Sequence, residues 1–214
     1  MKGRGLLVAL LLLLLPAAAH AESEIVADIS SHVVAVTTGF TGAELIVFGS
    51  IREVGDIAIV IEGPKGKATT RVKSRVLGIW INTDSFVFDD VPGFYSISTS
   101  QPVLDIASSQ AVNEKGIKLD RLHFPSRRTE DIRTNLFRKA LITRREVRGF
   151  YRESPQGVDV LEDRLFRSSF FLPANAPIGK YKARIYLFRE GQTVASQTVP
   201  FSVEETGLSA TVFE

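Results

Sequence analysis

Residues 37–49 constrain the fold most strongly, because they place a turn rich in glycine and threonine between two apolar runs. One run, residues 33–36, precedes the turn, and the other, residues 45–48, follows it. Short runs of β-branched and aromatic residues bounded by glycine are typical of strands in a buried sheet. Gly39 and Gly42 can adopt a positive φ without a Cβ clash. We therefore predict a structural turn at Gly39 and Gly42 that joins two β-strands.

The same pattern recurs along most of the chain. Turn clusters of glycine, proline and aspartate separate the apolar runs with the spacing of an all-β sandwich. These further runs are residues 25–29, 57–61, 86–88, 94–99, 158–161, 165–172, 181–188 and 194–203. Pro200 cannot donate to a ladder, so we expect the last run to be an edge strand.

Two tyrosines, Tyr95 and Tyr181, each follow a turn glycine by two residues and open an alternating strand. Two related modules in tandem would explain this similarity, and so would coincidence. We predict a mainly β protein with two tandem immunoglobulin-like β-sandwich modules and a helical insertion in the second. The expected divisions are a signal peptide at 1–21, a module at 22–105, a second module at 106–205 and a tail at 206–214.

The N-terminus has the composition of a secretory signal peptide. Two basic residues are followed by an unbroken apolar run at residues 6–15, a proline, and then Ala19-His20-Ala21. This order predicts export and cleavage after Ala21. Ten apolar residues are fewer than the roughly 20 that span a bilayer as a helix. The alternative is an uncleaved N-terminal anchor.

Residues 129–152 predict the one long helix. Thr129 suits the N-cap, and two acidic residues follow it in the first turn. Apolar residues recur at helical spacing and are expected to pack on the sheet; these are Ile132, Leu136, Ala140 and Leu141. The same spacing would turn basic residues outward as an interaction surface, namely Arg128, Arg138, Arg145 and Arg148.

Positive charge is concentrated around this helix. Residues 115–152 contain twelve Lys or Arg and four Asp or Glu, whereas the chain after residue 21 is formally neutral. Such a surplus favours an acidic partner, and outside the cytoplasm we expect a membrane protein or an anionic membrane surface rather than nucleic acid. An ordinary solvated helix face is the alternative interpretation. The oligomeric state is not predicted.

The composition argues against several chemistries. The chain has no cysteine, its one methionine is Met1, and only His32 and His123 follow the signal peptide. Zinc, copper and iron–sulfur sites need more such ligands. The aspartates Asp84, Asp89 and Asp90 lie in no calcium-loop pattern and are interpreted as turn formers. No nucleophile elbow or phosphate loop is present. We therefore predict no metal, no cofactor and no catalytic residues.

Four stretches, residues 37–49, 92–95, 137–142 and 172–189, resemble the alphaproteobacterial family of putative transmembrane proteins of unknown function. The resemblance implies an exported β-rich domain, usually followed by one C-terminal membrane helix, with no established activity. The sequence ends about where that helix would begin, so the 206–214 tail is expected to lead toward it.

The leading hypothesis is a non-catalytic periplasmic module, associated with the inner membrane, that assists a membrane protein such as a transporter. One alternative is a binding protein for a ligand of the cell envelope. The other is a hydrolase whose carboxylates come from separate strands, an arrangement that sequence order would hide.

Overall fold

Strand β4 (Asp56–Glu62) is covered on both of its faces. Every residue from Ile57 to Glu62 is buried, and a strand of this kind has a continuous apolar run instead of an alternating one. Its odd-numbered isoleucines enter one hydrophobic core, whereas Ala58 and Val60 enter a second. The sheet that contains β4 is therefore the middle layer of three.

The computed structural model describes residues 23–76, 79–126 and 132–206, with the backbone alone for residues 72–84. One outer layer is a four-stranded antiparallel sheet. Its strands, in spatial order, are β1 (Ile25–Ile29), β3 (Gly42–Ile51), β10 (Leu165–Pro173) and β9 (Asp159–Leu161).

The middle layer is a six-stranded sheet. Its end pairs, β2 with β12 and β7 with β8, are parallel, and its other pairs are antiparallel. The strands, in spatial order, are β2 (Val33–Val36), β12 (Gln192–Glu205), β11 (Gly179–Arg189), β4, β7 (Tyr95–Thr99) and β8 (Tyr151–Ser154). Phe166 and Phe170 from the first sheet meet Ile59, Ile185 and Phe201 from the second in the sandwich core.

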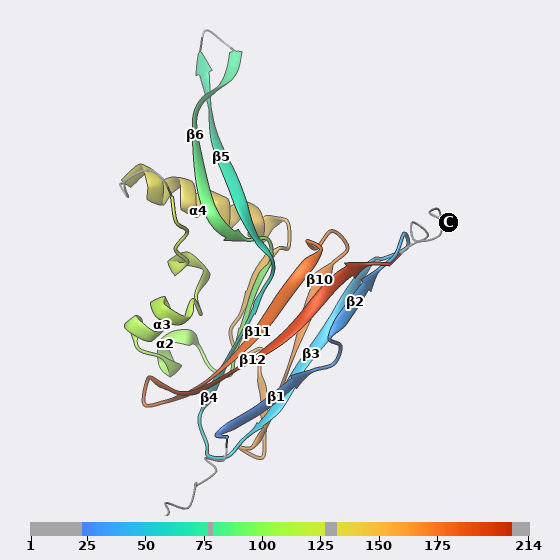
Figure 1. Ribbon diagram of the computed structural model, residues 1–214. Helices are drawn as coiled ribbons and strands as arrows, with labels where there is room; N and C mark the ends of the chain where they lie inside the picture. The colour runs from blue at the N-terminus through green and yellow to red at the C-terminus, as the bar shows by residue number, and fades with distance from the viewer. Residues whose placement is uncertain (1–22, 77–78, 127–131, 207–214) are drawn as a thin grey trace, which may run out of the picture.

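Helices and a long hairpin cover the far side of the six-stranded sheet. The helical elements are α2 (Val103–Ile106), α3 (Ser109–Lys115), the 3-10 helix η1 (Leu119–Arg121) and α4 (Ile132–Val147). Strands β5 (Lys65–Val76) and β6 (Ile79–Pro92) pair with each other. Figure 1 shows this hairpin rising beyond both sheets, with α4 crossing beside its lower part.

The prediction of a mainly β protein is confirmed, but the tandem arrangement of two immunoglobulin-like modules is not. Strand β3 from the first predicted module pairs with β10 from the second. Strand β4 likewise pairs with β11. Both sheets thus combine strands from either side of the predicted boundary between residues 105 and 106, and one sandwich is formed where two were expected.

The two tyrosines that suggested a repeat make different contacts. The Tyr181 hydroxyl donates to the carbonyl of Pro177, four residues upstream, at 2.6 Å. The Tyr95 hydroxyl donates to the carbonyl of Gly116, in the helical layer, at 3.0 Å.

The prediction that residues 194–203 form an edge strand is wrong, because β12 lies between β2 and β11 in the six-stranded sheet. The part of β12 around Pro200 nevertheless resembles an edge. Pro200 is opposite Lys182 of β11, while β2 joins the other side of β12 only from Ser202 onward. The sequence therefore places its proline where the second neighbour is missing.

The predicted long helix is shorter than residues 129–152. Helix α4 ends at Val147, and Gly149 has a φ of 73°. Residues Tyr151–Ser154 then form β8, parallel to β7. Helical periodicity did not foresee this strand, because β8 is only four residues long and is held by pairing with a distant segment.

Candidate interaction surfaces

Helix α4 packs through a face that differs from the predicted one. Thr134, Phe137, Leu141 and Ile142 are buried, and the Phe137 ring stacks on Phe86 with 5.5 Å between ring centroids. Of the four positions expected to pack on the sheet, Leu141 alone does so. The other three, Ile132, Leu136 and Ala140, are exposed, so that part of the prediction was wrong.

The exposed positions of α4 form an apolar stripe. Side chains three or four residues apart lie on one helix face, and this spacing relates Ile132, Leu136, Ala140 and Val147 through the intervening Thr143. Ile132 is 81% exposed, Leu136 is 64% exposed and Val147 is 83% exposed. We call these five residues the outward stripe. Because the buried residues lie on the opposite side, α4 has two apolar faces and packs with one.

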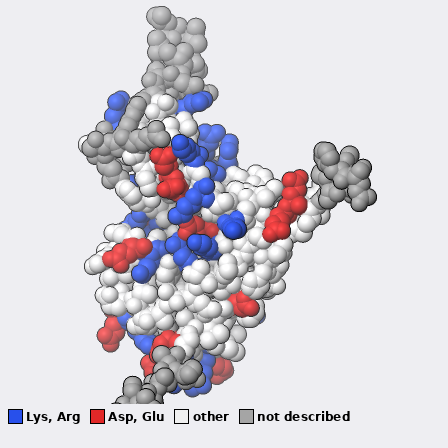
Figure 2. Space-filling view, in the orientation of Figure 1, with Lys and Arg blue, Asp and Glu red and all other residues white. Residues whose placement is uncertain are grey.

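Basic side chains border the outward stripe on both sides. Helical geometry places Arg133 and Arg144 along one border, and Lys139 together with Glu146 along the other, and all four are exposed. The exposed Arg148 follows the end of the helix at Val147. Figure 2 shows Lys and Arg gathered over α4 and over the sheet surface beside it, with a few acidic side chains among them. The stripe is therefore an apolar ridge with one positive border and one border of mixed charge.

Two arginines predicted to point outward are engaged with the protein. Arg138 donates to the Asn135 side chain at 2.6 Å and lies 3.4 Å from Nδ1 of His123. The Arg145 guanidinium lies 5.6 Å from the centroid of the Phe150 ring and donates to the carbonyl of Gly93 at 3.5 Å. Both are half-buried, and their role in an interaction surface stays a prediction. Arg148 is exposed as expected, and Arg128 lies outside the described residues.

A charge cluster centred on the buried Glu62 lies at the base of the hairpin. Glu62 is 8% exposed, and its two carboxylate oxygens contact Lys65 at 2.8 Å and Arg184 at 2.5 Å. Burial raises the pKa of the nearby Tyr95 and Tyr151 hydroxyls, and Glu62 raises it slightly further. Both oxygens of this carboxylate are thus occupied by cations that join β4, β5 and β11.

The glycines of the predicted turn differ in their conformations. Gly42 opens β3 with a φ of 120°, and a Cβ there would lie 2.6 Å from the Phe171 ring. Gly39 has open space around the same position. Gly42 is therefore the residue of this turn whose position requires glycine.

A comparison with protein families places this chain. The model of a family described as "Putative transmembrane protein (Alph_Pro_TM)" matches residues 24–214. The chain belongs to this family. None of the curated proteins matches it. Among the described helices, none has both the length and the apolar composition that crossing a bilayer requires.

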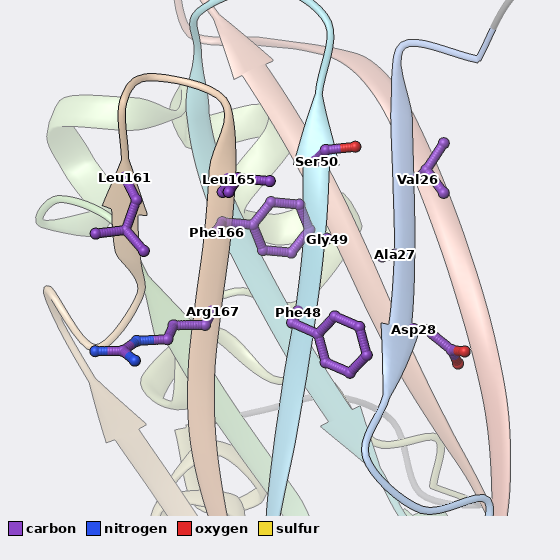
Figure 3. A pocket seen from close by; sticks show the side chains of 10 residues that line it. All are labelled: Val26, Ala27, Asp28, Phe48, Gly49, Ser50, Leu161, Leu165, Phe166 and Arg167. Carbon is purple, nitrogen blue, oxygen red and sulfur yellow. The ribbon is translucent and has the colours of Figure 1, made fainter.

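This family member has a hollow of about 490 Å³ on the outer side of its four-stranded sheet. Figure 3 shows Val26 of β1, Phe48 of β3 and Leu161 and Leu165 around it, with Arg167 of β10 at one end. Gly49 contributes to the floor, where a Cβ would lie 2.6 Å from the Phe166 ring. No local sequence pattern indicated this surface, although the strands that form it were predicted.

The histidines and aspartates considered for chemistry make separate contacts, apart from Asp84, whose side chain lies outside the described part of the chain. His32 lies 3.1 Å from Asp28, and the neighbouring Ser31 hydroxyl donates to the carbonyl of Val33. Asp89 lies 3.9 Å from Lys67, and Asp90 has a φ of 53°. Within residues 23–76, 79–126 and 132–206, no three metal-ligating side chains come together as a metal site.

Proposed function

We propose that this chain is a non-catalytic, exported module that binds the anionic surface of a membrane through α4 and there assists a membrane protein such as a transporter. The observation that carries the proposal is the outward stripe with basic residues on both borders. Helices that lie in a membrane interface combine an apolar face with Lys and Arg beside it.

The energetics of the stripe favour lipid over water. Removing apolar surface from water is favourable by about 25 cal/mol per Å², and Ile132, Leu136 and Val147 are largely exposed. Each basic group near an anionic surface adds on the order of 1 kcal/mol, which salt weakens. A protein partner would also accept the apolar stripe, but the flanking cations on both borders favour lipid headgroups.

The proposed location is the periplasmic face of the inner membrane. Support for export comes from the charged start, the apolar run at residues 6–15 and the small residues before Glu22. Support for a membrane comes from the family description, which is that of transmembrane proteins. A module held at this membrane surface would lie close to the proteins embedded in the membrane. On this basis we propose that it assists one of them.

Binding to lipid vesicles tests the proposal. The purified chain should sediment with vesicles that contain phosphatidylglycerol, and far less with phosphatidylcholine alone. Reversing two exposed charges, Arg144→Glu with Arg148→Glu, should weaken binding at least about tenfold, because roughly 1 kcal/mol per basic group is lost. Leu136→Ser should also weaken it.

The matched control is Val194→Ser, at an exposed aliphatic residue of β12. This variant should bind like the wild type. The proposal would be wrong if the wild type ignored anionic vesicles, or if the α4 variants bound them as well as the control does.

A further inference from the structure

The outer side of the four-stranded sheet carries an apolar patch that spans all four strands. Its members are each between 40% and 58% exposed, and they are Val26, Ile46, Phe48, Leu161, Leu165 and Phe171. The solvent side of an antiparallel sheet is ordinarily polar. Exposed apolar side chains gathered on one face mark an interaction surface, and we call these six residues the sheet patch; Asp28, Ser50 and Arg167 lie among them.

Strand register arranges the sheet patch in rows. Val26 is opposite Ser50, which is opposite Leu165, which is opposite Leu161. Residues paired in this way point to the same face. The next row is Asp28, Phe48, Arg167 and Asp159. Figure 3 shows side chains of both rows around the hollow.

The charges in the second row are placed symmetrically about Phe48. Asp28 is its neighbour on β1 and Arg167 is its neighbour on β10. A two-fold axis parallel to β3 that lies above Phe48, midway between the two sheets, would exchange these two sides. It would bring Asp28 of each copy opposite Arg167 of the other, and Val26 opposite Leu165. Self-complementarity of this kind is what an isologous interface requires.

We infer that the sheet patch is the contact between two copies of this chain, packed sheet against sheet with the two-fold axis along β3. Two sheets can stack about 10 Å apart with their strands within about 30° of each other. The patch is less suited to anionic lipid than α4 is, because Asp28, Asp159 and Glu44 outnumber Arg167 on its surface.

The existing ion pairs leave these charges accessible to a second copy. Arg167 lies 3.2 Å from Asp159, and both side chains are more than half exposed. Exposed pairs contribute little stability, so Arg167 can shift toward Asp28 of the second copy. Apolar contact then supplies most of the affinity, and the crossed charges set the alignment.

The size of the patch predicts a modest affinity. With the axis along β3, the strands that face a counterpart are β1, β3 and β10. Three strands about 4.8 Å apart and the ten residues of β3 at about 3.3 Å each cover roughly 10 by 30 Å. This is smaller than a standard specific interface, so the dimer should be weak and rapidly reversible. Helix α4 lies beyond the six-stranded sheet (Figure 1), so dimerisation leaves the outward stripe free.

Sedimentation velocity over a range of concentrations tests this inference on the full chain. The wild type should pass reversibly from monomer to dimer. Phe48→Ser should raise the dissociation constant at least about tenfold, because a central aromatic contact is lost. Val194→Ser, which lies outside the patch, should dimerise like the wild type. Unchanged thermal unfolding would show that each variant is folded.

Charge exchange tests the axis itself. Asp28→Arg alone and Arg167→Asp alone should each weaken the dimer, because like charges then face each other. The double variant Asp28→Arg with Arg167→Asp should restore it. A wild type that stays monomeric at every concentration overturns the inference, as does a dimer unaffected by Phe48→Ser. If the single variants dimerise weakly and the double variant does not recover dimerisation, the two-fold arrangement is overturned. If small molecules displace an apolar dye from the hollow while the chain stays monomeric, the hollow binds a small ligand instead of a second copy.

Discussion

Gly42 begins β3 in a backbone conformation that residues with a side chain rarely adopt. Its φ is 120°, and a Cβ at this position would lie only 2.8 Å from the Leu172 carbonyl oxygen, so both features exclude a larger residue. Gly42→Val should therefore lower the free energy of unfolding by more than about 1 kcal/mol. Gly39→Val is the control and should change it little. Urea unfolding measures both, and equal stability of the two variants would refute the assignment.

Arg144 and Arg145 are adjacent in sequence but have different surroundings. Arg145 contacts Phe150 and the Gly93 carbonyl, whereas Arg144 is exposed. Arg145→Glu should lower the unfolding free energy by more than about 1 kcal/mol, because it removes a cation–π contact and the hydrogen bond to the Gly93 carbonyl. Arg144→Glu should stay within about 0.5 kcal/mol of the wild type. Urea unfolding compares them, and a destabilised Arg144→Glu would contradict the proposed division of roles.

Helix α4 turns one of two apolar faces toward the protein. Phe137 is buried against Phe86, while its neighbour Leu136 is exposed. Phe137→Ala should cost about 3–5 kcal/mol of stability, as large-to-small changes in a core do. Leu136→Ala should cost far less. Thermal unfolding of the pair decides the orientation, and the reverse order of stabilities would show that the helix is rotated.

Local patterns in the sequence predict individual elements well. The strand at residues 25–29 and the helix ended by Gly116, which has a φ of 65°, follow directly from periodicity and capping. The orientation of α4 does not follow from them. Ile132, Leu136 and Ala140 recur at helical spacing, but so do the buried residues Phe137 and Leu141. Periodicity finds both faces and cannot say which one the sheet will cover.

The arrangement of the whole sandwich depends on contacts between distant segments. Strand β3 pairs with β10, more than 100 residues later. In β1, the backbone N–H and carbonyl of Ala27 both form hydrogen bonds with the Gln197 side chain. Such pairings leave no local signal, so consecutive strands suggested two modules where the chain forms one sandwich. The sheet patch was missed for the same reason, because register alone brings Val26 and Leu165 into one row.

Tyrosine burial makes the whole molecule sensitive to alkali. Burial raises the pKa of all four tyrosines, Tyr95, Tyr151, Tyr181 and Tyr186, above the ordinary value of about 10. Below pH 10, roughly, the phenols are neutral in both states and stability is complete. Above it the unfolded chain loses protons that the folded chain retains, so the free energy of unfolding should fall as pH rises.

Urea unfolding across this pH range, with phenolate absorbance followed in parallel, measures the effect. Tyr151→Phe should flatten the pH dependence, because one raised group is removed. Phenolate absorbance that rises near pH 10, roughly, while the chain stays folded would contradict the burial.

The contact between α4 and lipid can be observed at a single position. Because the chain has no cysteine, Leu136→Cys and the control Val194→Cys can each carry one polarity-sensitive fluorophore. On adding phosphatidylglycerol vesicles, the label at position 136 should shift to the blue and become shielded from an aqueous quencher, while the label at position 194 should not change. Absence of a shift at position 136, or an equal shift at both positions, would contradict the proposal that α4 is the membrane-binding surface.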